Sequence, residues 1–534
     1  MTDVQDIEAV TTQVKIDGQP DQKTRKYDRQ LRLWAASGQS ALENARILAI
    51  SATATSTSIL KNLVLPGIGH FTILDPQQVT PQDAGNNFFL EGQNSIGKSR
   101  AKEATRLLAE LNEDVNSAAD ERSLEEILES ETGREWIKEF TLIIAHNLEK
   151  GLLDRLAKLL WEDAKSPTLV VVRSAGFLAE FYIQFHEHTI IDSHSDSTPS
   201  LRIDKPFPAL LDYALSLDFD KMDPTDHGHV PYVYILVRAL EEWKKTHDGK
   251  PPQAYSDKKA FKASILSKKF KQDEENFDEA EAQAYRTWSV TGVPSEIQAL
   301  FKDPLSPSSA ANAATPLTPD SPPFFHLLDA LRRFTEKEPF VLPLTSTLPD
   351  MKANTESYIH LQKLYKKRSE EERDVIRELV KETGGEVDDA TLDLFVRNAH
   401  AVKVMRGKRW GVLDESEEAL GNAVDPSGKP LSIHLALSAL SEITAKQISP
   451  LTVEAVTKEA QTILPKGKEL PEDWDNIVGE MHVFSPTADL PNTAAFLGGM
   501  VAQEVIKMIT RQYIPIDGYC TADLIETWTG ILLA

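Results

Sequence analysis

Apolar residues first cluster in a strand–helix–strand pattern. Residues 46–51 form an apolar run, and Ile59, Leu60 and Leu63 recur at the spacing of one helix face. The segment 66–69 (PGIG) carries the proline and glycines that end a helix, and a second apolar run follows at 71–74. This order predicts a βαβ unit, with the second strand ending at Asp75.

The same alternation continues beyond this unit. Apolar runs at 141–146 and 168–177 predict further strands, and residues 95–112 and 152–164 have helical periodicity. Strands that alternate with helices are typical of a parallel sheet covered on both faces. From about residue 205 helical patterns dominate. Sheet-like material returns only at the end, with a helix over 494–510 and short strands near Tyr519 and Ile525.

We therefore predict an α/β domain that is split by a large, mainly helical insertion. Its first part covers residues 23–185 and its last part residues 476–534, with the insertion at 186–475. Residues 303–323 are rich in proline, serine and alanine, which predicts a flexible surface loop. The polar residues 1–22 are expected to be a disordered tail.

Composition narrows the function classes. The chain has 534 residues, 41% of them hydrophobic, which suits two or three globular domains. A net charge of −24 opposes binding to nucleic acid and to anionic membranes. We find no apolar run long enough to cross a bilayer and no apolar signal core at the N-terminus. Cys520 is the only cysteine, which excludes intrachain disulfides and cysteine metal clusters and favours the cytoplasm or nucleus.

The loop between the first strand and helix has no glycine. Nucleotide-binding units use glycines here, so that the backbone can approach the phosphates at the helix N-terminus. Four positions of this loop instead carry a side chain: Ser51, Thr53, Ala54 and Ser56. Their Cβ atoms make a positive φ costly and hinder a close phosphate. The pattern indicates a nucleotide-binding fold that no longer binds its own nucleotide, which also argues against a dinucleotide oxidoreductase.

Several blocks of the sequence carry a family resemblance. Residues 27–34 (YDRQLRLW), 60–69 (LKNLVLPGIG), 96–101 (IGKSRA) and 494–507 (AAFLGGMVAQEVIK) resemble the adenylation domains of ubiquitin-like-protein activating enzymes. That resemblance implies a Rossmann-like adenylation domain of the ThiF/MoeB type. Further blocks are similar to the regulatory, noncatalytic subunits of neddylation activating enzymes: 83–90 (DAGNNFFL), 201–210 (LRIDKPFPAL), 348–351 (LPDM) and 491–499 (PNTAAFLGG). The insertion then resembles a degenerate form of the domain that carries the catalytic cysteine.

The resemblance implies which catalytic features are missing. Asp75 remains for a ribose contact and Lys98 is kept, whereas Gln77, Asn86 and His146 replace an aspartate, an arginine and the magnesium-binding aspartate of active relatives. We therefore expect this chain to bind no cofactor and no metal. ATP and magnesium would lie on a catalytic subunit that forms a heterodimer with this chain and activates the ubiquitin-like modifier of the neddylation pathway. Cys520 follows the insertion, so it does not stand where the resemblance places the thioester cysteine.

The family resemblance also gives one residue a chemical role. The arginine of the YDRQ block, Arg29, would reach across the dimer to ATP on the partner, with Arg32 as the second choice. The alternative is that Arg29 forms a surface ion pair with Asp28 or another nearby acid.

Other functions stay open at this point. A noncatalytic subunit of the sumoylation activating enzyme shares YDRQ but is much shorter, and a self-sufficient adenylating enzyme would need the missing glycines and acids. His186 and His188 on a predicted strand, and the Asp226–His229 cluster, are interpreted as structural histidines, since no cysteine or helical His spacing supports a zinc site. The lysines of 258–271 precede an acidic run, which indicates a solvated surface.

Overall fold

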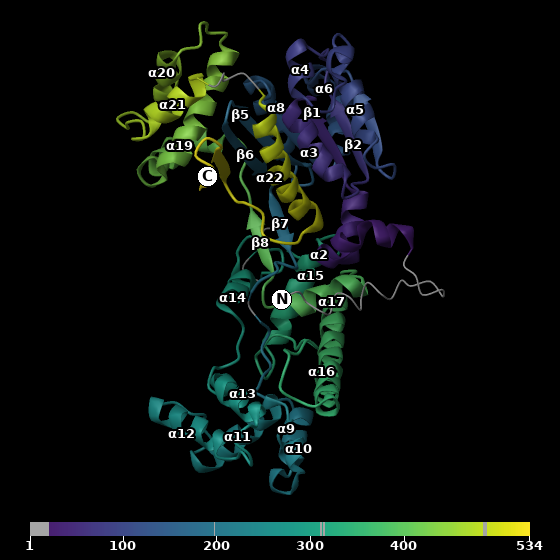
Figure 1. Ribbon diagram of the computed structural model, residues 1–534, viewed down its shortest axis with the longest axis vertical. Coiled ribbons are helices and arrows are strands. Elements are labelled where there is room, and N and C mark those ends of the chain that lie inside the picture. Colours follow the sequence, from purple (N-terminus) through teal and green to yellow (C-terminus); the bar gives the residue numbers. More distant parts are fainter. Residues whose placement is uncertain (1–20, 197, 310–311, 313–315, 484–488, 534) are drawn as a thin grey trace. The chain divides into compact units, whose positions relative to one another are not determined.

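The computed structural model describes residues 21–196, 198–309, 312, 316–483 and 489–533 (Figure 1). The predicted disordered tail at 1–22 falls almost entirely outside these residues. The chain divides into two compact units, one formed by 1–188 with 404–534 and the other by Thr189–Lys403. No helix in the described part of the chain has the length and apolar character needed to cross a membrane.

An eight-stranded sheet organises the first unit. Its strand order is β10-β9-β6-β5-β4-β1-β2-β3. The strands are β1 Arg46–Ile50, β2 His70–Leu74, β3 Asn116–Asp120, β4 Leu142–His146, β5 Thr168–Ala175, β6 Leu178–Gln184, β9 Tyr519–Asp523 and β10 Trp528–Leu532. The predicted parallel pairing is confirmed from β3 to β5, whereas β6, β9 and β10 join antiparallel. A second sheet pairs β7 Glu187–Ile190 with β8 Lys403–Arg406.

The parallel register places the carboxyl ends of three strands side by side. Ile50 lies opposite Leu74 on one side and opposite Ala145 on the other, so the carboxyl ends of β1, β2 and β4 are neighbours. Open parallel sheets bind ligands at this edge. Asp75 and His146 therefore stand on either side of the loop that follows β1.

Helices cover both faces of the sheet. The helices of this unit are α2 Gln22–Asn44, α3 Ala54–Val64, α4 Pro81–Asn86, α5 Arg100–Ala109, α6 Leu124–Glu129, α7 Glu131–Lys138, α8 Lys150–Trp161, α18 Val412–Glu415, α19 Glu417–Ala445, α20 Val453–Ile463, α21 Trp474–Val483 and α22 Pro491–Thr510. One face packs against α3, α5 and α22, and the other against α8 and α19. The predicted helix over 95–112 is shorter than expected because a 3-10 turn and Gly97, at φ 82°, precede α5.

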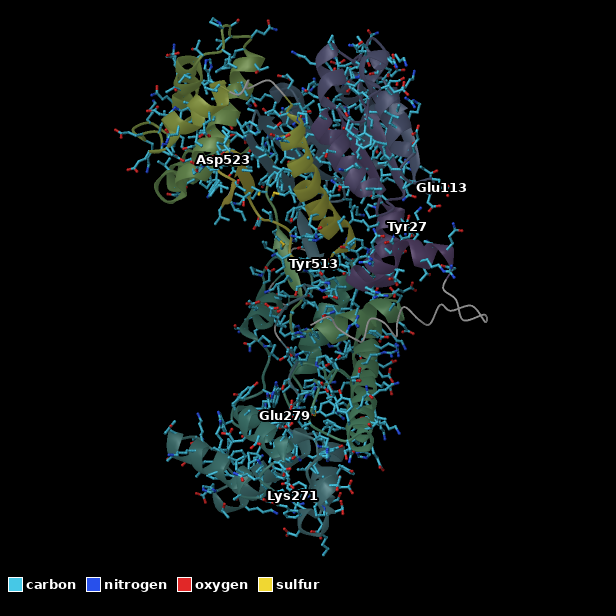
Figure 2. The ribbon with its side chains drawn as sticks, viewed as in Figure 1. Tyr27, Glu113, Lys271, Glu279, Tyr513 and Asp523 are labelled. Atoms are coloured by element: carbon cyan, nitrogen blue, oxygen red, sulfur yellow. The ribbon has the colours of Figure 1, made fainter. Side chains whose placement is uncertain are left out.

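Tyr27 anchors helix α2 beneath the turn that ends α3. This tyrosine, labelled in Figure 2, is buried, and its hydroxyl accepts a hydrogen bond from Asn112 Nδ2 (3.1 Å). Gly67 ends the turn at φ 89°, and a Cβ there would lie 2.6 Å from the tyrosine hydroxyl. The glycine of the PGIG stop is thus required both by backbone conformation and by packing.

The inserted unit ends earlier than the sequence suggests. We predicted the insertion to run to residue 475, but the chain rejoins the first unit at Val404. The reason is α19, whose consecutive residues Leu431, Ser432, Ile433, His434 and Leu435 are all buried. A helix that is buried all round lies inside a core. Here it packs between β6, β9 and β10 of the sheet and the helices α20 and α21.

The inserted unit is helical, as predicted. Its helices are α9 Pro208–Ser216, α10 Pro224–His227, α11 Tyr232–Thr246, α12 Tyr255–Leu266, α13 Glu275–Gln283, α14 Ser295–Lys302, α15 Pro323–Thr335, α16 Thr355–Glu382 and α17 Asp389–Asn398. Arg202 and Glu372 form a buried ion pair (2.6 Å) inside it. The described part of the 303–323 loop has neither helix nor strand before Pro323, where α15 starts, yet Ser306 and Ser308 are buried and hydrogen-bonded (2.8 Å). The predicted surface loop is therefore exposed only in part.

Candidate functional site

The loop between β1 and α3 keeps a glycine-like backbone without a glycine. Ser51 adopts φ 78°, in the left-handed region that side chains disfavour. Thr53 then caps α3, since its Oγ1 accepts the backbone N–H of Ser56 (3.1 Å). The cost predicted for a positive φ therefore applies at Ser51, whereas Thr53 has an ordinary extended conformation.

Asp75, the predicted ribose contact, is occupied by groups of the chain itself. Its carboxylate is buried, and Oδ2 accepts both the Ala52 backbone N–H (2.7 Å) and Arg100 Nε (2.7 Å). Oδ1 accepts the backbone N–H of Gln77 (2.9 Å). Arg100 also pairs with Asp83 (3.0 Å). The acid survives from the nucleotide-binding pattern, but here it holds the loop and a guanidinium.

His146 ends β4 and is buried. Its Nδ1 lies 2.9 Å from Thr53 Oγ1, and its Nε2 lies 2.9 Å from Ser174 Oγ. Burial lowers the pKa of His146 and outweighs the opposing effect of Asp489, so the ring is neutral at pH 7. A neutral imidazole between two hydroxyls does not supply the hard oxygen ligand that magnesium prefers.

The N-terminus of α3 is covered by a carboxylate from a distant segment. Asp489 Oδ2 accepts the backbone N–H of Thr55 (3.2 Å), and Oδ1 accepts the hydroxyl of Thr55 (2.7 Å). Asp489 lies two residues before Pro491, which starts α22. It stands 434 residues away in sequence, and we did not identify it from the sequence.

Asn87 and Arg100 were also missed. Asn87 is buried, and its amide donates to the Ala52 carbonyl (3.0 Å) while its oxygen accepts the Thr57 hydroxyl (2.9 Å). Its neighbour Asn86, which the resemblance places at the arginine of active relatives, is the last residue of α4. Both missed residues lie inside the blocks used for the family resemblance, so position within a motif was the signal that could have identified them. Lys98 is half exposed and pairs with Glu103 (3.5 Å).

These contacts make the site a poor fit for magnesium-bound ATP. The acid that would contact the ribose holds a guanidinium and two backbone N–H groups. The helix N–H groups of Thr55 and Ser56 are both engaged by side-chain oxygens. The position at which the resemblance expects the magnesium-binding aspartate holds the neutral His146. The polar groups brought together here already form hydrogen bonds with one another.

Arg29 and Arg32 lie outside this site, on α2. Arg29 is exposed, and no hydrogen bond or ion pair joins its side chain to another residue in the described part of the chain. Arg32 instead forms the ion pair with Asp28 (3.0 Å) that we had considered for Arg29. The structure thus separates the two arginines by environment, while their catalytic role stays a prediction.

Cys520 lies in β9, as the sequence indicated, and is buried. Burial first, and then Glu504 and Glu180, raise the pKa of its thiol to about 12. Because the thiolate is the nucleophile, this cysteine is inert at pH 7.

The histidines singled out in the sequence have structural partners. His227 is buried, stacks on Phe270 with ring centroids 3.8 Å apart, and lies 3.0 Å from Glu274. His186 stacks on Trp161 at 3.8 Å. His188 is buried beside Phe185, with ring centroids 6.0 Å apart, and burial lowers its pKa to about 4. These contacts agree with the structural interpretation.

One acidic group in the described residues has the spacing of metal ligands. Glu480, Asp523 and Glu526 offer oxygens within 4.8 Å of one another, with Asp523 labelled in Figure 2. Lys429 provides the positive charge there, with its ammonium 2.5 Å from Asp523 and 2.6 Å from Glu526. Two of the three carboxylates, those of Asp523 and Glu526, are therefore explained as partners of a lysine. That the chain binds no metal stays a prediction.

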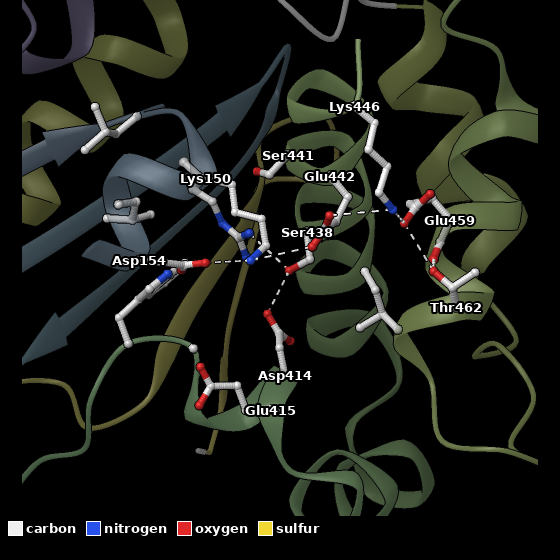
Figure 3. Close-up of a pocket in the computed structure, with 16 residues that line it drawn as sticks. Lys150, Asp154, Asp414, Glu415, Ser438, Ser441, Glu442, Lys446, Glu459 and Thr462 are labelled. Carbon is white, nitrogen blue, oxygen red and sulfur yellow. Dashed lines mark hydrogen bonds and ion pairs between the residues drawn. The ribbon is translucent and has the colours of Figure 1, made fainter. Parts of the chain in front are cut away.

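A cavity of about 330 Å³ opens on the other face of the same sheet (Figure 3). Its charged lining is paired internally, as in Lys150 with Asp154 (2.7 Å) and Lys446 with Glu459 (2.6 Å). On one side Asp414 holds His434 (2.8 Å), which belongs to a buried network with Arg173 and Glu180. The pairing leaves no clear preference for a ligand of either charge.

Comparison with known proteins identifies relatives along nearly the whole chain. The ThiF family model matches residues 27–146, which contain the βαβ unit and β4. The chain is 34% identical over 523 residues to the "NEDD8-activating enzyme E1 regulatory subunit" of Xenopus laevis, covering 92% of this chain and 95% of that protein. It is 33% identical over 522 residues to the "NEDD8-activating enzyme E1 regulatory subunit AXR1" of Arabidopsis thaliana, with 92% and 93% covered. The Drosophila melanogaster protein of the same description is 33% identical over 528 residues, with 95% and 96% covered.

Proposed function

Because the chain belongs to the family of NEDD8-activating enzyme E1 regulatory subunits, we propose that it is the noncatalytic half of a heterodimer. Its partner would be a catalytic subunit that binds ATP and magnesium and carries the thioester cysteine. The assembled enzyme would join the C-terminal carboxylate of NEDD8 to AMP, with release of pyrophosphate. The cysteine of the partner would then attack the adenylate, forming a thioester with the modifier and releasing AMP. The sumoylation alternative finds no support among these relatives.

One observation carries the noncatalytic role of this chain. The groups that would receive a nucleotide at the carboxyl edge of the sheet are bound to one another, from Asp75 with Arg100 to Asp489 with Thr55. A ligand would have to break these buried hydrogen bonds, and each buried group left without a partner costs about 1–3 kcal/mol. The chain is therefore proposed to bind neither ATP nor magnesium itself.

Arg29 is the proposed contribution of this chain to the chemistry. It is exposed on α2, and its guanidinium makes no ion pair with the other described residues. A permanently charged, planar side chain of this kind is suited to stabilise phosphoryl oxygens on a partner. Arg32, already paired with Asp28, is the second choice.

The proposed location is the cytoplasm and nucleus. Its support is chemical, since the single thiol, Cys520, is buried and the sequence cannot form an intrachain disulfide.

ATP–pyrophosphate exchange tests the proposal directly. The chain, the catalytic subunit and their equimolar mixture are each assayed with NEDD8, after size-exclusion chromatography of the mixture. We expect a stable heterodimer, full exchange only in the mixture, and none with this chain alone. NEDD8-dependent exchange by the isolated chain would contradict the noncatalytic role, and separate elution with no gain in exchange would contradict the pairing.

A further inference from the structure

The proline-rich segment 303–323 repeats one short motif. The pattern Pro-X-Ser/Thr-Pro occurs in its described part at residues 304–307 (PLSP), 316–319 (PLTP) and 319–322 (PDSP). Proline has no backbone N–H. A hydroxyl group directly before proline therefore suits the protein kinases whose pocket for the next residue offers no acceptor to an N–H, the proline-directed class. The sequence alone does not distinguish the three hydroxyl groups.

Burial separates these three hydroxyl groups. Ser306 is 1% exposed, and its hydroxyl is hydrogen-bonded to that of Ser308 (2.8 Å). Ser321 is half-buried, and its Oγ accepts the backbone N–H of Thr318 (3.0 Å). Thr318 is exposed, and so is the proline that follows it. Among the three, Thr318 is therefore the residue that is open to an enzyme.

The chain around Thr318 is also easy to open. Phosphoryl transfer needs the acceptor hydroxyl in line with the γ-phosphate, so the neighbouring residues must fit the kinase cleft. Thr318 stands in a surface turn, in which the Ser321 N–H donates to the Thr318 carbonyl (2.9 Å) and the two hydroxyl oxygens lie 3.3 Å apart. Pro319 lies beside Gly384, just after α16, yet stays exposed. Opening this turn hands its polar groups to water, which compensates for the lost hydrogen bonds.

Helix α15 holds the third motif back. Ser321 stands two residues before Pro323, the first residue of α15, and three before Phe324, which is 3% exposed. To place Ser321 in a kinase cleft, the first turn of α15 would have to unfold and expose that ring, with a loss of hydrophobic free energy. The three residues after Thr318 all lie outside the helix, so its modification leaves α15 intact.

We propose that Thr318 is a phosphorylation site for a proline-directed protein kinase. The threonine hydroxyl oxygen attacks the γ-phosphorus of ATP on the kinase, the bond from that phosphorus to the bridging β,γ-oxygen breaks, and ADP leaves. The hydroxyl proton passes to the catalytic base of the kinase. The product carries about 1.5–2 negative charges at pH 7, next to Asp320. The proposal does not depend on the pairing with a catalytic subunit.

A kinase assay on the folded full chain tests this site. The chain is incubated with an active mitogen-activated protein kinase and magnesium-bound ATP, and mass spectrometry assigns the phosphorylated residues at early times. We expect phosphate on Thr318 before any other residue. Thr318→Ala should lower the initial rate at least about tenfold, whereas Thr318→Ser keeps the hydroxyl and should keep most of the rate.

Ser306 and Ser321 provide matched controls, because each has the same prolines at the same spacing. Ser306→Ala and Ser321→Ala should both keep the rate of the parent within about a factor of two. A synthetic peptide of residues 301–326 has no fold that buries Ser306. The same kinase should therefore modify Ser306 and Thr318 at comparable rates in the peptide.

Four results would overturn the proposal. In the folded chain these are early phosphate mainly on a residue other than Thr318, a Thr318→Ala variant as good a substrate as the parent, or no phosphorylation when the peptide is modified. The fourth is a peptide with the same preference for Thr318 as the folded chain, which would show that sequence and not burial selects the site.

Discussion

Gly498 of α22 lies directly against Ser58 of α3. A Cβ built on Gly498 would stand 2.2 Å from Ser58 Oγ and 2.9 Å from its backbone carbonyl carbon. A change of the serine rotamer would not remove the second contact. The approach of these two helices fixes where α22 starts, and so where Asp489 meets Thr55.

Gly498→Ala should therefore destabilise the first unit. Forcing a methyl group into a packed contact typically costs about 1–3 kcal/mol. The adjacent Gly499 is exposed and has nothing within 4 Å of its would-be Cβ, so Gly499→Ala should instead stabilise the helix by about 0.5–1 kcal/mol. Urea unfolding of both variants gives the comparison. Equal stabilities would contradict the close packing.

Ser51 should be a strained position. Its φ of 78° costs a side-chain-bearing residue of the order of 1 kcal/mol, and glycine removes that cost. Ser51 Oγ also accepts from Arg100 Nη2 (3.3 Å), so Ser51→Ala is needed as the control that loses the hydroxyl and keeps the strain. We expect the free energy of unfolding of Ser51→Gly to exceed that of Ser51→Ala by about 1 kcal/mol. A less stable glycine variant would refute the strain.

His434 should make the stability of the first unit depend on pH. It is buried between Glu180 (2.7 Å) and Asp414 (2.8 Å); although burial opposes the charged ring, these carboxylates raise the pKa of His434 to about 9. The folded state thus holds a proton that the unfolded state releases near pH 6.5. The contribution of this proton to the free energy of unfolding is complete below pH 6.5. It falls by about 1.4 kcal/mol per pH unit above pH 6.5 and is lost as the pH passes 9.

Urea unfolding between pH 7 and 8 measures this slope. The window ends below the pH of about 9 at which the Cys520 thiol of the unfolded chain ionises, while the folded thiol, whose pKa is raised to about 12, stays protonated. His434→Gln should be less stable at pH 7 and should lose most of the slope. A variant with the same slope as the parent would show that another group is responsible.

The sequence predicts the core of the βαβ unit well because local patterns determine it. Predicted and observed limits of β1 differ by one residue, and the stop at Gly67 follows from a positive φ that glycine itself permits. The end of the insertion was misjudged because α19 looks like any apolar helix until its packing on β6 and β9 is known. Periodicity reports that a helix is buried, and it does not report against which element.

The sequence predicts that the nucleotide site is degenerate, but it does not predict which residues occupy it. Missing glycines and the replacements at Gln77 and His146 indicated a degenerate nucleotide site. Which groups would fill it depends on contacts across the chain, such as Asp489 with Thr55, 434 residues apart. Carboxylates are common on protein surfaces, so no sequence pattern marks the one that will meet a helix N-terminus after folding.

Arg29→Ala should slow adenylation by the heterodimer and leave its assembly intact. The arginine is exposed on α2, whereas Arg32 is engaged with Asp28 (3.0 Å). Loss of a charge-assisted contact to a phosphoryl group in the transition state costs about 2–4 kcal/mol, or about 30- to 1,000-fold in rate. Pyrophosphate exchange at subsaturating ATP measures it, and Arg29→Lys should recover only part of the rate because a lysine offers a point charge.

Arg32→Ala is the matched control for this prediction, since it removes the same charge from the same helix. If Arg29 acts on the nucleotide of the partner, exchange should fall much further in Arg29→Ala than in Arg32→Ala, and the dissociation constant of the heterodimer should change in neither. Thioester transfer from preformed adenylate should also be unaffected, because the phosphoryl chemistry has then been completed. Exchange by Arg29→Ala within about a factor of two of the parent, a difference of only about 0.4 kcal/mol, would exclude the role in trans. A larger loss in Arg32→Ala would move that role to the arginine that now pairs with Asp28.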